Sequence, residues 1–203
     1  YGGSPTPADI VLTTDGGANW TQQESGATGL LNSVSFVNAN VGTVVGDYGA
    51  VLRTTDGGVT WTKLTHGTTN PIYSLDFVDS HIGVAVGAPG SRSPGRIHRT
   101  TNGGEQWNTL ADPSIIALNQ VKFIDSASAI AVGDHGEIVR STDKGETWTT
   151  EASMTDKPLR AVSFASTSTG IAVGGNFFLD QEQVVLRTVD GGVTWSPEST
   201  GTT

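Results

Sequence analysis

The sequence predicts an all-β protein, a β-propeller built from four-stranded antiparallel blades. An eight-residue motif ending in Trp occurs five times, strand-like segments lie between its copies, and glycine is abundant, with 27 residues among 203. The copies follow one another at intervals of roughly 40 to 50 residues, the usual length of a propeller blade. Glycine-rich turns between short strands favour sheets, and no segment requires a helix.

The repeated motif, called the box below, is expected to be a structural turn. It reads TTDGGANW at 13–20, TTDGGVTW at 54–61, TTNGGEQW at 100–107, STDKGETW at 141–148 and TVDGGVTW at 188–195. We expect its third residue to accept hydrogen bonds from backbone amides, its glycines to adopt positive φ, and its Trp to pack between blades. The residues assigned to this role are Asp15, Trp20, Asp56, Trp61, Asn102, Trp107, Asp143, Trp148, Asp190 and Trp195. Asn102 indicates that an oxygen acceptor matters more than a charge.

Four short strands, called a to d, are predicted in each repeat. Polar and apolar residues alternate up to a Phe, a polar turn follows, and two short apolar runs lead into the box. Because one blade cannot cover both of its faces, the apolar residues of strands a and b should form the core between neighbouring blades. These residues are Val34, Phe36, Val44, Leu75, Phe77, Val84, Val121, Phe123, Ile130, Val162, Phe164 and Ile171.

The chain is expected to form a single propeller domain, residues 1–203. Four blades are complete in sequence, at 30–64, 72–110, 117–150 and 159–197, and residues 9–23 supply only strands c and d of a half blade. A five-bladed ring could close around this half blade, which we favour, or the chain could be a piece of a larger propeller. An open propeller would expose a strand edge and an apolar blade face.

The box Ser/Thr-x-Asp-x-Gly-x-Thr-Trp resembles the Asp box of the bacterial neuraminidase repeat. With the segments of the type VsFv…GxaVGdxGxIlrT, the chain resembles the photosystem II stability/assembly factor-like branch of that repeat family, from Asp9 to Trp195. The resemblance implies a propeller that binds protein, and a basic surface that binds acidic peptide. Candidates for that surface are Arg53, Arg99, Arg140 and Arg187, which share one register before the box. Alternatively, each pairs with a local carboxylate such as Asp47 or Asp134, or packs along its own blade.

Recognition is predicted on the face that carries the loops between strands b and c, called the b–c face. The length differences between blades fall in these loops, which are long at 87–96 and 174–183. The a–b turns and the boxes should emerge on the opposite face. Long loops on a rigid scaffold are the usual place for recognition. The predicted contacts are Arg92, Arg96, Phe177, Phe178 and Leu179, with the alternative that the apolar triplet folds back on its blade.

Several functional classes are disfavoured. The net charge of −9 without a basic cluster argues against nucleic acid, and the absence of cysteine excludes disulfides and thiolate metal sites. The four His lack ligand spacing, so we expect no metal and no cofactor. No apolar run has the length of a membrane span. A sialidase needs three converging Arg, a Tyr with a Glu partner and an Asp acid, and neither Tyr48 nor Tyr73 has a nearby Glu.

The expected function is therefore that of a non-catalytic exported module that binds a protein partner, including copies of itself or other domains of a larger chain. The alternative is a carbohydrate-binding or sialidase-like glycoside hydrolase propeller. The Thr, Ser and Gly-rich composition with few Lys favours an extracellular, cell-surface or periplasmic location, or the thylakoid lumen for a photosynthetic assembly factor.

Overall fold

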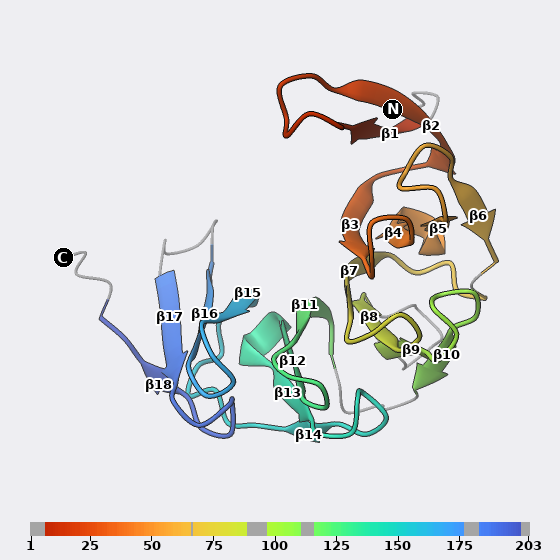
Figure 1. Cartoon of the computed structure of the whole chain (residues 1–203). Helices are drawn as coiled ribbons and strands as arrows, with labels where there is room; N and C mark the ends of the chain where they lie inside the picture. The colour runs from red at the N-terminus through yellow and green to blue at the C-terminus, as the bar shows by residue number, and fades with distance from the viewer. Residues whose placement is uncertain (1–6, 66, 89–96, 111–115, 177–182, 200–203) are drawn as a thin grey trace, which may run out of the picture.

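A computed structural model describes residues 7–65, 67–88, 97–110, 116–176 and 183–199. Within these residues the chain forms five antiparallel sheets that follow one another around an arc (Figure 1). The first sheet, the half blade, has two strands, β1 (Pro7–Leu12) and β2 (Thr21–Thr28). The other four sheets have four strands each, so the all-β propeller class with four complete blades and an N-terminal half blade is confirmed.

The four complete blades contain the remaining strands in chain order. Blade 1 contains β3 (Leu31–Phe36), β4 (Gly42–Gly46), β5 (Val51–Thr54) and β6 (Thr62–Leu64). Blade 2 contains β7 (Ile72–Phe77), β8 (Gly83–Gly87), β9 (Ile97–Thr100) and β10 (Asn108–Leu110). Blade 3 contains β11 (Leu118–Phe123), β12 (Ala129–Gly133), β13 (Ile138–Ser141) and β14 (Thr149–Thr150). Blade 4 contains β15 (Leu159–Phe164), β16 (Gly170–Gly175), β17 (Gln183–Thr188) and β18 (Ser196–Pro197).

The arc is open. The first strand of each complete blade, β3, β7, β11 or β15, faces its inside, and the last strand lies on its outside (Figure 1). Among the described strands, β1 pairs only with β2, so strands a and b of the half blade have no counterpart in its sheet. Blade 4 and the half blade lie at opposite ends of the arc, well apart (Figure 1).

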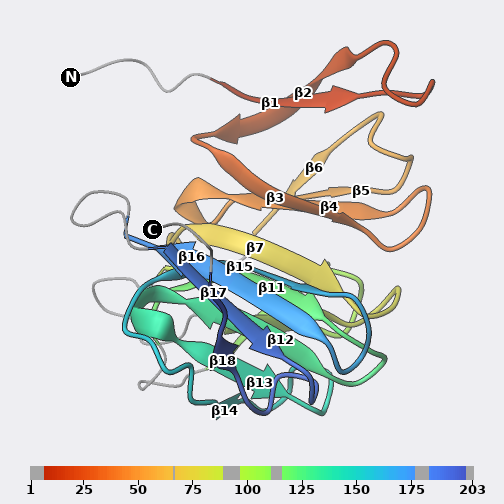
Figure 2. The same ribbon diagram turned by 90° about the vertical axis from the view of Figure 1, so that its left-hand side faces the viewer.

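The boxes and the a–b turns lie on one face of the arc. The β1–β2 and β3–β4 connections both lie on the right-hand side of Figure 2. In each complete blade the box is attached to the a–b turn, as in the hydrogen bond from the Gly57 amide to the carbonyl oxygen of Asn40, 2.8 Å long. The equivalent bonds in blades 2 to 4 start at Gly103, Lys144 and Gly191. The b–c connections therefore lie at the opposite end of the strands.

Apolar cores lie between the blades. Each complete blade has a forward face, directed along the chain order of the blades, and a rear face, directed toward the preceding blade. Between blades 2 and 3, for example, Val84, Val86 and Ile97 pack forward against the rear face of blade 3. That rear face contributes Leu118, Val121, Ala131 and Val139, and all seven residues are buried. Equivalent clusters join the half blade to blade 1, blade 1 to blade 2 and blade 3 to blade 4.

Three residues predicted for these cores are exposed instead. Val34 and Phe36 are on the rear face of blade 1, and Ile171 is on the forward face of blade 4, with exposed fractions of 58%, 44% and 44%. The half blade lacks the strands that would cover the first two, and no described blade follows blade 4. The prediction was wrong for these positions because the alternation in a strand identifies a blade face, while burial also requires a neighbouring blade.

In each complete blade a glycine stands at the end of strand b, because the backbone of the linker before strand a lies against it. A Cβ added at Gly133 would overlap the carbonyl oxygen of Ala117, and the same overlap occurs at Gly46, Gly87 and Gly174. The adjoining hydrogen bond from the Asp134 amide to that carbonyl is 2.9 Å long. A close backbone approach thus ties the b–c end of every complete blade to the linker that enters it.

Candidate functional site

Each box is a tight turn held by its own side chains. In the box of blade 1, Asp56 Oδ1 accepts hydrogen bonds from the Thr54 hydroxyl at 2.8 Å and from the Thr60 amide at 2.9 Å. Asp56 Oδ2 accepts a third from the Thr60 hydroxyl at 2.6 Å. Gly57 and Gly58 have φ of 75° and 90°, a region that favours glycine. Both carboxylate oxygens of Asp56 are thus occupied within the turn.

The same contacts recur around Asp15, Asp143 and Asp190. Hydrogen bonds stabilise the ionised carboxylate, and they lower the pKa of each of the four box Asp to about 2. For Asp56 the largest cause is the hydrogen bond from the Thr60 hydroxyl. Burial raises the pKa of Asp143, but the hydrogen bonds from Thr147 outweigh it. These carboxylates serve their own turns as anions.

The box of blade 2 contains Asn102 and keeps the turn without a charge. Asn102 Oδ1 accepts hydrogen bonds from the Thr100 hydroxyl and from the Gln106 amide, both at 2.9 Å. The hydroxyl that bonds the second carboxylate oxygen in blade 1 is replaced here by the Gln106 side chain. An oxygen acceptor is therefore sufficient to close this turn.

The box Trp packs together with the Phe that ends strand a, a partner that the sequence reasoning did not assign. The rings of Phe77 and Trp107 meet edge to face, with centroids 5.9 Å apart and an interplanar angle of 70°. The same contact occurs between Phe36 and Trp61 and between Phe164 and Trp195. The recurrence of a Phe before each a–b turn was the signal for this contact.

In blades 1 to 3, the Arg that precedes the box reaches forward to the box of the next blade. Its Nε donates a hydrogen bond to the backbone carbonyl oxygen of the fourth box residue. Because the guanidinium is charged, this is a charge-assisted hydrogen bond. The bonds join Arg53 to Gly103, Arg99 to Lys144 and Arg140 to Gly191, each at 3.0 Å. These hydrogen bonds go to the next blade and not to Asp47 or Asp134. Arg140 also interacts with a carboxylate of its own blade, that of Asp125.

Arg187 is the member of this register that no described blade follows. Its side chain is exposed, and it makes no hydrogen bond or ion pair with another residue of the described ranges. The predicted Arg ring is therefore divided. Three of its guanidinium groups hold neighbouring blades together, and Arg187 alone among these four presents its charge to solvent.

The b–c face is only partly described. The predicted partner contacts lie outside the described residues, and they are Arg92, Arg96, Phe177, Phe178 and Leu179. The structure does describe one end of the inner strands β3, β7, β11 and β15, and this end lies at the b–c face. Each inner strand contains a β-bulge there, at Asn32, Tyr73, Asn119 and Arg160. Bulges re-aim side chains, and they recur next to functional sites.

Two of the bulge residues bridge neighbouring blades. Asn32 Nδ2 donates to the carbonyl oxygen of Ile72 at 3.0 Å, and Asn119 Nδ2 donates to that of Leu159 at 2.8 Å. A third, Arg160, pairs with Asp134 of the preceding blade at 3.1 Å, with 57% of its side chain exposed. An exposed pair of this kind contributes little to stability, so its Arg is free to exchange partners.

The two short b–c loops each present one exposed ring side chain at the same face, Tyr48 and His135. They form the 3₁₀ turns η1 (Asp47–Gly49) and η2 (Asp134–Gly136). Their central residues, Tyr48 and His135, have φ of 55° and 56°, which non-glycine residues seldom adopt. Tyr48 is 69% exposed. Like the bulge residues, these two side chains belong to the described part of the b–c face, and the sequence reasoning did not select them as contacts.

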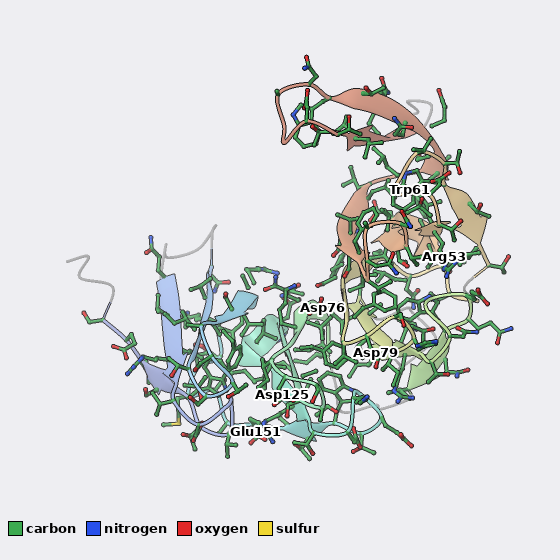
Figure 3. The ribbon with its side chains drawn as sticks, viewed as in Figure 1. Arg53, Trp61, Asp76, Asp79, Asp125 and Glu151 are labelled. Atoms are coloured by element: carbon green, nitrogen blue, oxygen red, sulfur yellow. The ribbon has the colours of Figure 1, made fainter. Side chains whose placement is uncertain are left out.

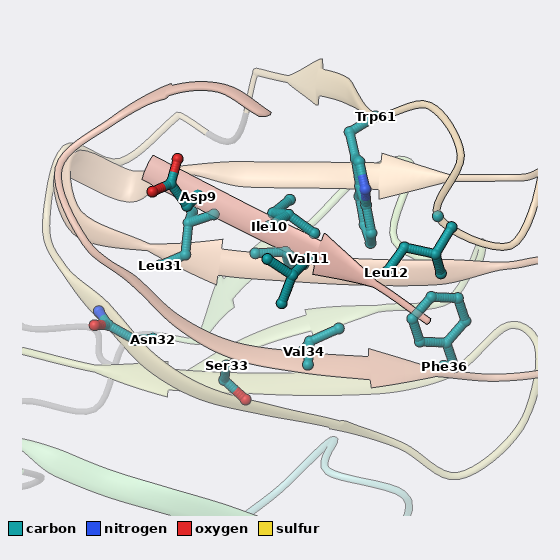
Figure 4. Close-up of a pocket in the computed structure, with 12 residues that line it drawn as sticks. Asp9, Ile10, Val11, Leu12, Leu31, Asn32, Ser33, Val34, Phe36 and Trp61 are labelled. Atoms are coloured by element: carbon teal, nitrogen blue, oxygen red, sulfur yellow. The ribbon is translucent and has the colours of Figure 1, made fainter. Parts of the chain in front are cut away.

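A cavity of about 330 Å³ lies between the half blade and blade 1 (Figure 4). Strands β1 and β3 line it with Ile10, Val11, Val34 and Phe36, and Trp61 closes one side. It occupies the place where strands a and b of the half blade would pack if that blade were complete. The cavity is mainly apolar and open, and it follows from the incomplete blade.

The acidic residues outside the boxes also hold backbone. Asp79 Oδ1 accepts from the amides of His81 and Ile82, both at 2.8 Å. Asp76 accepts from the Phe123 amide of the next blade at 2.9 Å (Figure 3). Each resolved pKa shift of a described carboxyl group is downward. A general acid of a glycosidase needs the opposite shift.

Two further observations concern the described ranges alone. No group of three or more His, Asp or Glu side chains in them is arranged to hold a metal ion. No helix in this part of the chain is long and apolar enough to cross a membrane.

Solved structures of known proteins share this fold. A structure described as YCF48 bound to D1 peptide is 23% identical and matches 90% of this chain with a TM-score of 0.68. YCF48 from Cyanidioschyzon merolae is 20% identical and matches 95% with a TM-score of 0.67. The GH74 enzyme of Niastella koreensis is 20% identical and matches 93% with a TM-score of 0.75. The chain spans 56%, 67% and 34% of these three proteins. At such identities the likeness shows the fold alone.

No curated protein matches the chain. The profile of the family described as Photosynthesis system II assembly factor YCF48 matches residues 5–122, more than half of the chain. The matched range contains the half blade, blades 1 and 2 and nearly all of β11, with three of the boxes and the contact between Arg53 and Gly103. The likeness inferred from the box and from the Arg-Thr strand ends is thereby confirmed, and the chain belongs to the photosystem II assembly factor YCF48 family.

Proposed function

We propose that this chain is a non-catalytic, exported module that binds a peptide segment of a protein partner through its b–c face, in the manner of an assembly factor. The observation that carries the proposal is the family membership. A solved structure of the same fold, described as YCF48 bound to D1 peptide, names a peptide as the kind of ligand. A D1-type segment is therefore the first ligand to test.

The distribution of polar groups supports the b–c face over the box face. On the box face, the carboxylates and amides satisfy one another within the turns, as around Asp56. On the b–c face, Tyr48 is exposed and Arg160 is held only by a surface ion pair. Aromatic and Arg side chains are the groups most often used as binding anchors. The loops at 87–96 and 174–183 add Arg92, Arg96 and the Phe177-Phe178-Leu179 triplet to the proposed surface.

The test is a titration of a fluorescently labelled D1 peptide with the chain of residues 1–203, followed by anisotropy. Two double variants remove aromatic groups from the b–c face, Tyr48→Ser with His135→Ser and Phe177→Ser with Phe178→Ser. We expect each to weaken binding by about tenfold or more, as for an anchor worth roughly 1.4 kcal/mol. Thermal unfolding should change little, because Tyr48 is exposed.

The matched control lies on the box face. Val59 and Val193 occupy the sixth position of two boxes and are 58% and 45% exposed. Their replacement by Ser should leave the affinity for the peptide unchanged. Equal losses in both sets of variants, or no binding by the unaltered chain, would refute the proposal. A large fall in stability for the Phe pair without a binding change would place those rings in the core.

A glycoside hydrolase is the second candidate, because the GH74 enzyme of Niastella koreensis has a TM-score of 0.75, higher than the 0.68 and 0.67 of the two YCF48 structures. The GH74 enzyme of Xanthomonas campestris is described as a xyloglucanase, and this chain spans 34% of it. The measurement is release of reducing sugar from xyloglucan, together with turnover of a panel of fluorogenic glycosides that includes sialosides. Turnover that survives purification would favour this candidate. Binding of xyloglucan without turnover would favour a carbohydrate-binding module.

The proposed location follows from the proposed function. An assembly factor for photosynthetic complexes would act in the thylakoid lumen, and a member of the family in another organism would act at the cell surface, outside the cell or in the periplasm. Fractionation of cells that express the full-length gene would decide among these compartments. Recovery in the cytosolic fraction alone would contradict export.

A further inference from the structure

The inner strands of neighbouring blades meet through side chains that accept hydrogen bonds from backbone amides. The strands β7, β11 and β15 follow one another on the inside of the arc, and each pairs on one side with strand b of its own blade (Figure 1). The Val121 amide donates to the Ser74 hydroxyl at 3.3 Å, and the Val162 amide donates to Gln120 Oε1 at 2.6 Å. The amides at the other edge of these strands therefore point to the preceding blade.

At the junction of blades 2 and 3, this edge also holds a carboxylate. Asp76 Oδ2 accepts a hydrogen bond of 2.9 Å from the amide of Phe123, the last residue of β11. Asp76 Oδ1 lies 3.5 Å from Lys122 Nζ. A carboxylate of this chain is thus held by one backbone amide and one ammonium group, on the inside of the arc (Figure 3).

Blade 3 has a lysine where blade 2 has this aspartate. Lys122 is the fifth residue of β11 as Asp76 is the fifth residue of β7, and Phe164 ends β15 as Phe123 ends β11. An ammonium group has three N–H donors and no acceptor. Lys122 therefore cannot accept from the Phe164 amide. The junction of blades 3 and 4 has two donors at this level and lacks the carboxylate that would join them.

A cavity of about 400 Å³ lies at this junction. The end of β11, the end of β15 and the a–b turn of blade 4 line it, with Lys122, Ser163 and Phe164 among the lining residues. The Lys122 side chain is 46% exposed, and its distance of 3.5 Å from Asp76 is longer than the roughly 2.7–2.9 Å of a direct charge-assisted hydrogen bond. Lys122 therefore retains N–H donors for a second acceptor. Both walls of the cavity belong to complete blades.

We propose that this cavity is a binding site for a carboxylate group. One carboxylate oxygen would accept from the Phe164 amide and the other from Lys122 Nζ, as the two oxygens of Asp76 are held at the preceding junction. The Ser163 hydroxyl, which also lines the cavity, can donate to the same group. The site lies at the end of the inner strands next to the a–b turns, so it is independent of the peptide binding proposed for the b–c face.

The donors favour a carboxylate over other acceptors. An ammonium group forms stronger hydrogen bonds with an anion than with a neutral carbonyl group. Lys122 supplies one positive charge, which suits a carboxylate better than a phosphate group with its charge of about −1.5 to −2. The carboxylate can come from a free organic acid or from an acidic side chain of a protein partner, and the experiment separates these two sources.

The experiment is a titration of the nitrogen-15-labelled chain of residues 1–203 at neutral pH and constant ionic strength, followed by the amide signals in NMR spectra. The probes are acetate, its neutral analogue acetamide, and inorganic phosphate. Acetate should shift the Phe164 amide signal saturably, and acetamide should not. A capped peptide with a single Glu and the same peptide with Gln test the second source. Tighter binding of the Glu peptide than of acetate would identify a protein side chain, and the reverse order a free organic acid.

Two substitutions at one position test the donor set. Lys122→Met removes the charge and should weaken acetate binding by about tenfold. Lys122→Asp places a carboxylate where blade 2 has Asp76, so it should abolish acetate binding and slow the hydrogen exchange of the Phe164 amide without any ligand. The control is Lys63→Met, which removes an exposed ammonium group from the outer strand of blade 1 and should leave acetate binding unchanged.

Four results would overturn the proposal, each in a variant or chain whose remaining amide signals show that the fold is retained. The first is an equal shift of the Phe164 amide signal by acetate and acetamide, and the second is tighter binding of phosphate than of acetate. The third is unchanged acetate binding in Lys122→Met. The last is unchanged hydrogen exchange of the Phe164 amide in Lys122→Asp.

Discussion

The Nε atom of Arg53 donates a hydrogen bond of 3.0 Å to the carbonyl oxygen of Gly103, in the box of the following blade. Strand c of one blade is thereby connected to the outer turn of the next. The same bond recurs at Arg99 and Arg140, while apolar residues fill the space further in. Neighbouring blades are therefore joined by a directional polar contact at the box face as well as by an apolar core.

The Arg contact can be tested by comparing two positions of the same register. Arg53→Leu leaves the Gly103 carbonyl without its donor, and we expect the free energy of unfolding to fall by about 1–2 kcal/mol. Arg187→Leu should change it by less than about 0.5 kcal/mol, because the Arg187 side chain is exposed. Urea denaturation at low protein concentration measures both. Equal effects at the two positions would mean that the inter-blade hydrogen bond does not stabilise the fold.

Thr43 is expected to be a site of stabilisation. Its hydroxyl is buried on the forward face of blade 1 without a hydrogen-bond partner, where blades 2 and 3 have Val84 and Ile130. Thr43→Val keeps the shape and removes an unsatisfied polar group, so the free energy of unfolding should rise by about 1 kcal/mol. The reciprocal control, Val84→Thr, should lower it by about 1–2 kcal/mol. A loss of stability in Thr43→Val would show that a water molecule satisfies the hydroxyl.

The box carboxylates should make the fold sensitive to acid. The pKa of Asp56 is about 2 in the folded chain, below the ordinary value of 3.8 that holds for the unfolded chain. The unfolded chain therefore takes up its proton at a higher pH. The stabilisation from this difference is complete above about pH 4 and is lost as the pH falls through about 2. Asp15, Asp143 and Asp190 have the same shift, so the free energy of unfolding should decline steeply between pH 4 and pH 2.

Two substitutions separate this effect from general acid unfolding. Asp56→Asn copies the box that already contains Asn102, and it should make the decline between pH 4 and pH 2 shallower. Asn102→Asp adds a carboxylate that has the Thr100 and Gln106 donors in place, and it should make the decline steeper. The measurement is urea denaturation at a series of pH values. Parallel curves for the three proteins would exclude the box carboxylates as the cause.

Replacement of a box Trp by Ala should lower the free energy of unfolding by an amount that depends on whether a preceding blade covers that Trp. Trp195 is 5% exposed against blade 3, and Trp195→Ala should lower the free energy of unfolding by about 3–5 kcal/mol. Trp20 is 60% exposed, and Trp20→Ala should cost less than about 1 kcal/mol. Thermal or urea unfolding at low protein concentration gives both values. Similar costs would mean that the half blade is covered in solution.

Much of the scaffold was predictable from the sequence because the same box and the same strand pattern recur in successive repeats. Five copies of one box give the blade length, and the Phe before each a–b turn and the Arg before the last four boxes give the strand register. The partner of Arg53 was not predictable, because Gly103 lies in the next repeat and a register alone does not say whether a side chain points to its own blade or to a neighbour. The b–c bulge at Asn119 was hidden for a similar reason, since it appears only when β11 is paired with β12.

The sequence by itself determined the blade, its four strands and the residues of its turn, because these depend on contacts within about 40 residues that every repeat makes again. The tertiary structure decided which of the equivalent residues are buried. Val132 and Val173 occupy the same position in successive blades, yet one is fully buried and the other 39% exposed. The difference comes from the arc, because a blade face is removed from water only where another blade follows it.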